Sequence, residues 1–470
     1  MDNNEFKELY QGWLETLTAN FPYTNPAIFD TKEEFPILNS GIMYMQGGKT
    51  VPVENFKEIR DCGFNISIYK GFSKDTIEAN YDNANAANVK LLGWCDEFAN
   101  SNSECLSKVE NKPAFAGINL SDEPKPGSLT GDNIEISAEK NLLELYYFFK
   151  NELALASLMF INLHYISETN TDGYTKEYLE NFQQYFRPAL FSYDYYPIAE
   201  RSNLIHEGLT SYPIQEGWLV FDNQTFYYNL EEFSKISKKY SRPFWAFCES
   251  MNTLNLYGSA YHPVALEQYL RFEAFSALAY GAKGIVYWTY NMRSTNTKES
   301  FLSSLLNRLG EKTASWYFAQ KVNQEIHKYS FIFLNGEHKS ANLTNNYSYR
   351  STNPHFKFNI SSSSESDCNE SNSNESNSNE YKLLIGEFIY GKDTYLMVVS
   401  ADPFNYHNIN LNVSTYNETW AKITELTPII SNGKENTILE NGINERIMPP
   451  GGYRIFKFLT VQPVITVPID

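Results

Sequence analysis

Acidic side chains at the ends of two apolar runs are the residues of this 470-residue sequence best suited to chemistry. The segment FAGINLSDEP, residues 115–124, is apolar until Asp122 and Glu123, and the proline that follows blocks any continuation of the run. The segment RPFWAFCES, residues 242–250, places Glu249 in the same way. One carboxyl that donates a proton and a second that attacks carbon or activates water would form an acid–base pair. Taken alone, each acid could instead be a solvated loop residue.

Eight short apolar runs that alternate with segments of helical spacing must position these acids. Such alternation predicts parallel strands, and eight strand–helix units are what a (β/α)8 barrel requires. A doubly wound sheet is the alternative, but it would normally have fewer strands for this length. The eight runs lie at residues 35–44, 62–71, 89–97, 115–124, 158–165, 188–197, 242–250 and 283–290. Helices are expected at residues 133–156, 176–186, 227–240, 264–282 and 300–328.

The pattern changes after residue 330, where short strand-like runs follow one another closely. This spacing is typical of an antiparallel β-sandwich. The expected fold class is therefore α/β: a (β/α)8 TIM barrel at 35–330 followed by a C-terminal antiparallel β-sandwich at 331–470. Residues 1–34 form an N-terminal extension, to which we assign no function. A tract rich in Ser, Asn and Glu at 361–380 cannot bury apolar area and is expected to be a disordered loop.

In a parallel barrel the carboxyl ends of all strands meet at one mouth, so the last residues of the runs should lie together. They include carboxylates, an amide and aromatic rings, but no histidine pair at metal spacing, glycine-rich phosphate loop or serine nucleophile elbow. We therefore expect no metal and no cofactor. Two carboxylates among aromatic rings suit the hydrolysis of a glycosidic bond. The candidate site residues are Trp94, Asp96, Asp122, Glu123, Asn162, Asp194, Tyr195, Tyr196, Glu249, Trp288 and Tyr290.

Charge and hydropathy exclude other classes of partner. The net charge of -18 and the pI near 5.0 argue against nucleic acid, whose phosphates the protein would repel. No apolar run approaches the roughly 18 residues of a membrane span, and the sequence begins without a signal peptide pattern. The protein is then either intracellular or exported with its signal removed. Five cysteines without close pair spacing indicate neither a disulfide framework nor a zinc knuckle.

The motifs DEP, INLHY, SYDYYP, PFWAFCES and ALAYGAKGIVYWTY occur in this order. With them the chain resembles the clan A barrel glycoside hydrolases, which include β-galactosidases and cellulases, and more narrowly glycosidase-like barrel-plus-sandwich proteins of gut bacteria. The resemblance implies Glu123 as the acid/base and Glu249 as the nucleophile of a retaining enzyme. It further implies Tyr195 or Tyr196 as the tyrosine that orients the nucleophile, and Trp288 as a sugar-stacking platform. It also implies a carbohydrate substrate and an exported protein.

One position departs from the family pattern, because Asp122 stands where those enzymes commonly have asparagine. A carboxylate there accepts a hydrogen bond from a sugar hydroxyl but cannot donate one, and its charge would favour the protonated form of Glu123. Asp122 could also be the acid itself.

Other interpretations stay open at this point. Asp194 could simply anchor its loop, and Trp94, Trp288 and Tyr290 could be core residues. The barrel could bind carbohydrate without catalysis, or the protein could be a structural surface protein. A retaining pair predicts carboxyl groups about 5 to 5.5 Å apart, whereas about 6.5 to 9.5 Å would indicate inversion.

Overall fold

The chain is described here by a computed structural model. The described residues are 34–40, 49–69, 73–95, 98, 103–124, 158–167, 174–185, 188–201, 210–214, 217–255, 261–291, 299–344, 356–364, 383–415, 420–427, 437–439 and 442–461. The predicted N-terminal extension lies outside this part except for Glu34, and the predicted helix at 133–156 and Asp96 also lie outside it.

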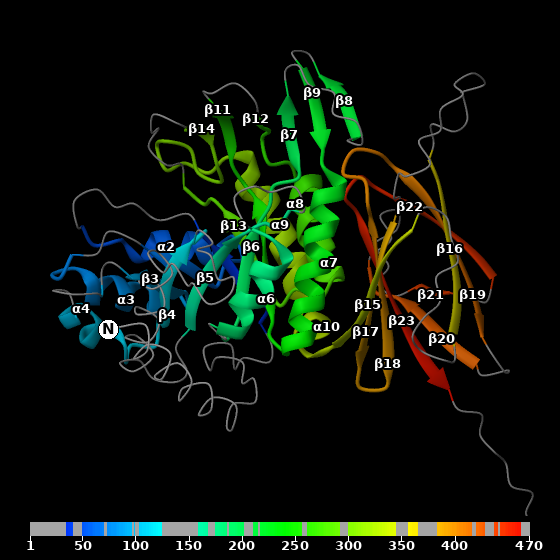
Figure 1. Ribbon diagram of the computed structural model, residues 1–470, viewed down its shortest axis with the longest axis horizontal. Coiled ribbons are helices and arrows are strands. Elements are labelled where there is room, and N and C mark those ends of the chain that lie inside the picture. Colours follow the sequence, from blue (N-terminus) through cyan, green and yellow to red (C-terminus); the bar gives the residue numbers. More distant parts are fainter. Residues whose placement is uncertain are drawn as a thin grey trace, which may run out of the picture.

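Eight parallel strands close into a barrel, as the alternating pattern predicts. The order around the barrel is that of the chain, and β13 pairs with β1 to close it. This is a TIM barrel, which Figure 1 shows on the left and in the centre. The strands are β1 (Ile37–Asn39), β2 (Ile66–Tyr69), β3 (Lys90–Trp94), β4 (Phe115–Asp122), β5 (Leu158–His164), β6 (Phe191–Asp194), β10 (Phe244–Glu249) and β13 (Gly284–Trp288).

Helices separate the strands and cover the outside of the barrel. Those in the described residues are α2 (Val53–Asp61), α3 (Ile77–Ala86), α4 (Ser103–Val109), α6 (Lys176–Tyr185), α7 (Asn223–Tyr240), α8 (Glu267–Ala279), α9 (Ala314–Lys328) and the short α10 (Ser330–Asn335). Helix α7 begins four residues before the predicted start, because the Asp222 side chain caps it by accepting a hydrogen bond from the Thr225 N–H at 3.0 Å.

Two apolar layers hold the barrel together. The inner layer fills the space inside the strands with residues such as Leu38, Ile68, Phe160 and Val286, all 2% exposed or less. The outer layer packs the opposite strand faces against the helices. Strand β4 fits closely against β5 only because residue 117 is glycine, since a Cβ atom there would lie 1.9 Å from the Leu158 carbonyl oxygen.

An additional antiparallel sheet, which the sequence pattern did not predict, is formed by segments that follow β6, β10 and β13 in the chain. It therefore lies beyond the carboxyl ends of the barrel strands, at the top of Figure 1. In spatial order its strands are β14 (Glu299–Ser303), β11 (Asn252–Asn255), β12 (Tyr261–His262), β7 (Ile198–Arg201), β9 (Gly217–Phe221) and β8 (Thr210–Ile214).

The predicted helix at 300–328 is wrong in its first part. Residues 300–303 belong to β14, and helix α9 begins only at Ala314. Between them Asn307 accepts hydrogen bonds from the N–H groups of Leu309 and Glu311, and Gly310 has a φ of 77°. An asparagine that bonds nearby backbone and a glycine in the left-handed region favour a turn over a continuous helix.

The C-terminal region consists of antiparallel sheets, as predicted. One has the order β15 (Glu337–Thr344), β17 (Leu383–Tyr390), β18 (Asp393–Ser400), β23 (Tyr453–Val461), β20 (Trp420–Glu425) and β21 (Thr437–Leu439). The other has the order β16 (Phe356–Ser364), β19 (His407–Thr415) and β22 (Gly442–Met448). The start of the predicted loop at 361–380 is wrong, because residues 361–364 continue β16 against β19, and backbone pairing needs no apolar side chain. Residues 365–380 lie outside the described part.

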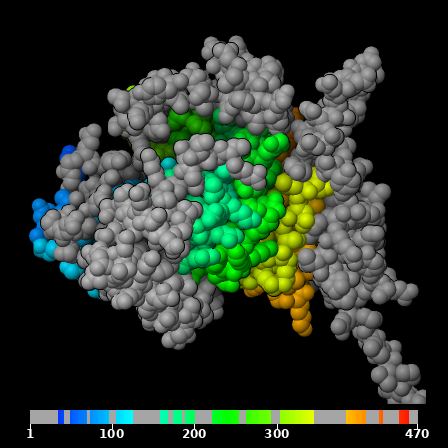
Figure 2. Space-filling view, in the orientation of Figure 1, coloured from blue at the N-terminus to red at the C-terminus, as the bar shows by residue number. Residues whose placement is uncertain are grey.

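The first C-terminal sheet packs on helix α8 of the barrel. The rings of Phe275 and Tyr453 stack with centroids 3.6 Å apart, and a Cβ atom on Gly386 would lie 2.7 Å from the Ala279 carbonyl oxygen. In Figure 2 the green surface of the barrel adjoins the yellow and orange surface of this sheet. The two regions are therefore joined by a close-packed contact. No helix in the described part of the chain is long and apolar enough to cross a membrane.

Candidate active site

A small polar cavity lies at the carboxyl ends of the barrel strands, where the sequence predicts the site. Four predicted site residues line it, and its volume is about 10 Å³, which is about the space of one water molecule. Its walls combine two tryptophans, two phenylalanines and four polar side chains. The lining residues are Ser40, Ile68, Trp94, Asn119, Asp122, Phe160, Asn162, Phe247 and Trp288.

The two acids at the end of β4 sit on a sharp turn. Both side chains are exposed, and Glu123 has a φ of 46°, in the left-handed region that few residues other than glycine adopt. The turn is held by a hydrogen bond from the Glu123 N–H to the Asn162 carbonyl at 2.9 Å, and by one from the Tyr174 hydroxyl to the Glu123 carbonyl at 3.2 Å. An unfavourable conformation that neighbours enforce is typical of functional sites.

A chain of side-chain hydrogen bonds orients Asp122. Asn162 on β5 is 2% exposed, and its Nδ2 donates to Asp122 Oδ1 at 3.0 Å. The Ser192 hydroxyl on β6 in turn donates to Asn162 Oδ1 at 3.0 Å. The amide of Asn162 is thus fixed in one orientation, and Asp122 is held as an acceptor at the wall of the cavity.

Asp194, at the end of β6, lies against the acids of β4. Its carboxyl group interacts with that of Glu123, and two neighbouring carboxyl groups favour the protonated form of the buried one, Asp194. Burial first, and then the charges of Glu123 and Asp122, raise the pKa of Asp194 well above its usual value. Its Oδ1 atom is buried and has no hydrogen-bond partner in the described part of the chain. The structure therefore brings Asp194 into the same group of acids and leaves it one unused acceptor.

Tyr196 lies near acids at the ends of three strands. Burial raises its pKa, and the charges of Asp194, Glu249, Asp122 and Glu123 all raise it further. A single phenol that is influenced by all four carboxyl groups shows that the ends of β4, β6 and β10 converge on one place. The neighbouring Tyr195 points elsewhere, because its hydroxyl donates to Asp222 Oδ2 at the start of α7.

Glu249 ends β10 in an enclosed environment. It is 4% exposed, its Oε1 lies 2.6 Å from Nδ1 of His262 on β12, and its N–H donates to Glu273 Oε2 on α8 at 2.7 Å. Burial raises the pKa of Glu249, while His262 lowers it. Burial and the charge of Glu249 raise the pKa of Glu273 well above its usual value. His262 is therefore the group that favours a carboxylate at Glu249.

The predicted aromatic residues divide into two groups. Trp94 and Trp288 are partly buried, line the cavity and pack on the core inside the barrel. Tyr290 is 2% exposed, and its hydroxyl accepts a hydrogen bond from Trp316 Nε1 at 3.1 Å under helix α9. The structure thus places Tyr290 in the outer core and not at the cavity, because the chain has turned away from the mouth after Trp288 and Thr289.

The sequence analysis missed Asn119, His262 and Glu273, and also the cavity-lining residues Ser40, Ile68, Phe160 and Phe247. Asn119 was visible as a polar residue inside the apolar run of β4, and its buried Oδ1 has no hydrogen-bond partner among the described residues. His262 and Glu273 had no such signal, because one lies in a two-residue strand and the other in a helix that is buried almost throughout. Within the described residues, no three His, Cys, Asp or Glu side chains are grouped to hold a metal ion.

Comparisons with known proteins agree with the barrel fold. The glycoside hydrolase 42 family model, described as beta-galactosidase, matches residues 147–329, which include Glu249 but not Glu123. No curated protein matches the sequence. Gan42B, a GH42 beta-galactosidase from G. stearothermophilus solved as a catalytic mutant, aligns over 90% of this chain and 98% of its own, with 7% identity and a TM-score of 0.51.

A beta-galactosidase from the psychrophilic Marinomonas ef1 aligns over 63% of this chain with 12% identity and a TM-score of 0.44. This chain spans 60% of that enzyme's length. The protein thus has the barrel fold of Gan42B, and its residues 147–329 are similar to the glycoside hydrolase 42 beta-galactosidases.

Proposed function

We propose that the protein is a retaining glycoside hydrolase that acts on β-galactosides, with its activity in the barrel predicted at 35–330. The observation that carries the proposal is the convergence of acids from β4, β6 and β10 around Tyr196. The family model supports a galactoside as the sugar, because its match includes β10 and Glu249.

In the first step, the carboxylate of Glu249 attacks the anomeric carbon while Glu123 gives its proton to the departing glycosidic oxygen. The bond from the anomeric carbon to that oxygen breaks, and an ester between the sugar and Glu249 forms. In the second step, Glu123 takes a proton from water, the hydroxide attacks the anomeric carbon, and the ester bond breaks. Both carboxyl groups return to their starting states, and the configuration at the anomeric carbon is retained.

The surroundings of each acid support its role. His262 favours the ionised form of Glu249 that attack requires. Asp194, whose pKa burial and the neighbouring acids raise, lies beside Glu123 and favours a proton near the position where the leaving oxygen must be protonated.

Sugar binding falls to the residues that line the cavity. Asp122, held by Asn162, would accept a hydrogen bond from a sugar hydroxyl, as would the unused Oδ1 of Asp194. Trp94 and Trp288 would pack against the apolar face of the ring. Because Asp122 can accept but cannot donate, the site should favour a sugar with a free hydroxyl group at this position.

Hydrolysis of nitrophenyl glycosides tests the proposal directly. Wild type should cleave the β-galactoside faster than the matched β-glucoside or α-galactoside. Glu249→Gln should lower kcat/KM at least about a thousandfold, and Glu123→Gln about 10² to 10⁴-fold. The loss in Glu123→Gln should be smaller for a dinitrophenyl leaving group, which needs little protonation.

Glu104→Gln provides the control, because Glu104 on α4 is an exposed acid that pairs with Lys74 away from the mouth. Its activity should equal that of wild type. Undiminished hydrolysis in Glu123→Gln or Glu249→Gln would overturn the assignment. A wild-type protein that binds galactosides but cleaves none would show a carbohydrate-binding barrel without catalysis.

A further inference from the structure

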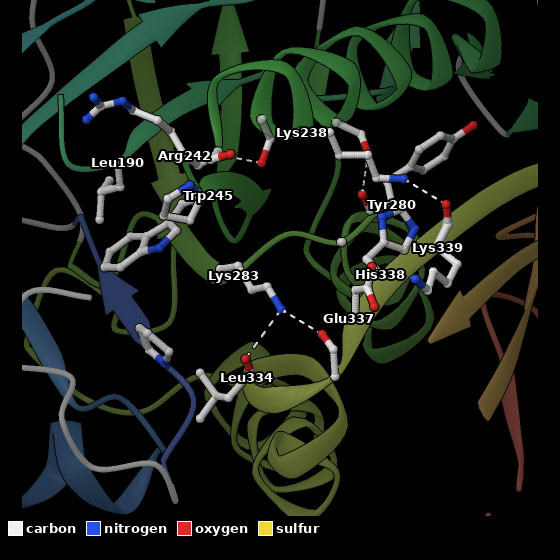
Figure 3. A pocket seen from close by; sticks show the side chains of 17 residues that line it. Leu190, Lys238, Arg242, Trp245, Tyr280, Lys283, Leu334, Glu337, His338 and Lys339 are labelled. Atoms are coloured by element: carbon white, nitrogen blue, oxygen red, sulfur yellow. Dashed lines mark hydrogen bonds and ion pairs between the residues drawn. The ribbon is translucent and has the colours of Figure 1, made fainter. Parts of the chain in front are cut away.

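A second and larger cavity lies at the opposite end of the barrel, where the strands begin. Its volume is about 690 Å³, within the range of small-molecule sites. Pro36, Leu190, Pro243 and Lys283 line it, and each immediately precedes a barrel strand. The end of α7, the residues Tyr280 and Gly281 after α8, and the connection from α10 to β15 also form the wall, and Figure 3 shows Tyr280, Lys238 and His338 among them. The cavity therefore lies between the barrel and the start of the C-terminal region.

The wall of this cavity is strongly positive in a protein whose net charge is -18. Lys238, Arg242, Lys283 and Lys339 line it; among the described lining residues the only carboxylate is Glu337, which pairs with Lys339 at 2.5 Å. Neither Lys238 nor Lys283 forms an ion pair with a described residue, and Lys238 donates instead to the Lys339 carbonyl at 2.9 Å. The cavity thus has an excess of positive charge and would attract an anion.

Lys283 reaches across the cavity to the end of α10 (Figure 3). Its Nζ donates to the carbonyl oxygens of Phe333 at 2.6 Å, Gly336 at 3.2 Å and Leu334 at 3.4 Å. These bonds satisfy its N–H groups and explain its position as a cap of the helix, but neutral carbonyls do not balance its charge. Burial lowers the pKa of Lys283 to about 8, as expected for an ammonium group without a counter-ion.

His338 adds a group that needs a hydrogen-bond donor. Burial and the nearby charges of Lys238 and Lys283 lower its pKa to about 3, so the ring is neutral at pH 7 and carries one N–H. Backbone groups of Ser340 and Ala279 hydrogen-bond the ring. Its Nε2 atom is buried and has no hydrogen-bond partner in the described part of the chain. A hydroxyl group entering the cavity would satisfy this nitrogen.

We propose that this cavity binds a small organic anion that also carries hydroxyl groups, of the class of phosphorylated or carboxylated monosaccharides. The anionic group would lie near Lys238 and the charge of Lys283, and a hydroxyl would donate to His338. Capping of α10 accounts for the hydrogen bonds of Lys283, whereas an anionic ligand with a hydroxyl group also accounts for the charges of Lys238 and Lys283 and for the unpartnered Nε2 of His338. The site lies at the other end of the barrel from the candidate active site, so the proposal does not rest on the proposed function.

Calorimetric titration of the full chain tests the proposal without any activity assay. The probes are glucose 6-phosphate and gluconate. The controls are inorganic phosphate, which lacks the sugar hydroxyl groups, and glucose, which lacks the charge. Both probes should bind, and each should bind at least about tenfold more tightly than either control, because each control lacks one kind of contact. Absence of binding by both probes at millimolar concentration would overturn the proposal. Phosphate binding as tight as glucose 6-phosphate would overturn the role of His338.

Two adjacent lysines at the end of α7 provide matched variants that locate the binding. Lys238 lines the cavity, whereas Lys239 pairs with Glu180 at 3.0 Å and does not line it. Lys238→Glu should weaken probe binding at least about tenfold, and Lys239→Glu should leave it unchanged. Equal affinities of the two variants would place the bound probe elsewhere and overturn the assignment. Both positions are exposed, so thermal unfolding should show both variants folded.

Discussion

Replacing His262 with glutamine should move the acidic limb of the pH profile for hydrolysis to higher pH. The structure places His262 Nδ1 2.6 Å from Glu249 Oε1, and this contact lowers the pKa that burial raises. Glutamine keeps a hydrogen-bond donor but removes the positive charge. Without that charge Glu249 holds its proton more tightly, so the nucleophilic carboxylate forms only at higher pH.

The size of the effect follows from the contact. An opposite charge this close typically lowers the pKa of a carboxyl group by about 1 to 3, and a pKa difference of 1 corresponds to about 1.36 kcal/mol. The acidic limb of kcat/KM should therefore lie about 1 to 3 pH units higher in His262→Gln than in wild type. On that limb the variant should be slower than wild type by about tenfold for every pH unit that separates the two profiles, while the rates at the plateau stay close.

The assay is kcat/KM for a dinitrophenyl β-galactoside from about pH 4 to 9, because kcat/KM reports the pKa values of the free enzyme. His164→Gln is the matched control. His164 lies at the end of β5, but its Nδ1 contacts the Tyr165 carbonyl at 2.9 Å and its ring stacks on Tyr174. An unchanged acidic limb in His262→Gln, or an equal displacement of the limb in His164→Gln, would refute the reasoning.

Three further predictions concern stability. Burial raises the folded pKa of Glu273, so its contribution to stability is complete below the ordinary glutamate pKa of about 4.3 and is lost as the pH rises through the higher folded value. Glu273→Gln should therefore flatten the pH dependence of the melting temperature. At pH 8 the melting temperature of the variant should be higher than that of wild type, and a lower melting temperature would contradict this. Gly386→Ala should cost about 1 to 3 kcal/mol in urea unfolding, because the new Cβ meets the Ala279 carbonyl at 2.7 Å, and a neutral effect would contradict the packing. Glu425→Ala should cost about 3 to 5 kcal/mol, because it leaves the buried Arg454 without its carboxylate partner at 3.2 Å; a loss below about 1 kcal/mol would show that the pair is not buried.

The barrel could be predicted because each of its strands is a short apolar run whose end is marked by polar residues. Asp122, Glu249 and Asp194 all stand at such ends, so their convergence followed from the parallel topology. The choice between Tyr195 and Tyr196 could not be made in this way. Both follow β6 directly, and only the contact of Tyr195 with Asp222 shows which ring faces the acids.

The additional sheet could not be predicted, because its strands carry too little pattern. Strand β12 has two residues, and β11 reads NTLN, so neither shows alternation. His262 reaches Glu249 only because this sheet folds back over the barrel mouth. Tyr290 illustrates the opposite error, since it continues the run of β13 in sequence but turns into the outer core.

Covalent labelling tests the central claim, which is that Glu249 attacks the sugar. A dinitrophenyl 2-deoxy-2-fluoro-β-galactoside should slow the second step and trap the glycosyl-enzyme ester. Intact-protein mass spectrometry should then show a single added fluorogalactosyl group, peptide mapping should place it on Glu249, and Glu249→Gln should remain unlabelled. Labelling of another residue, or turnover of the unfluorinated galactoside by a protein that never forms the adduct, would contradict the account.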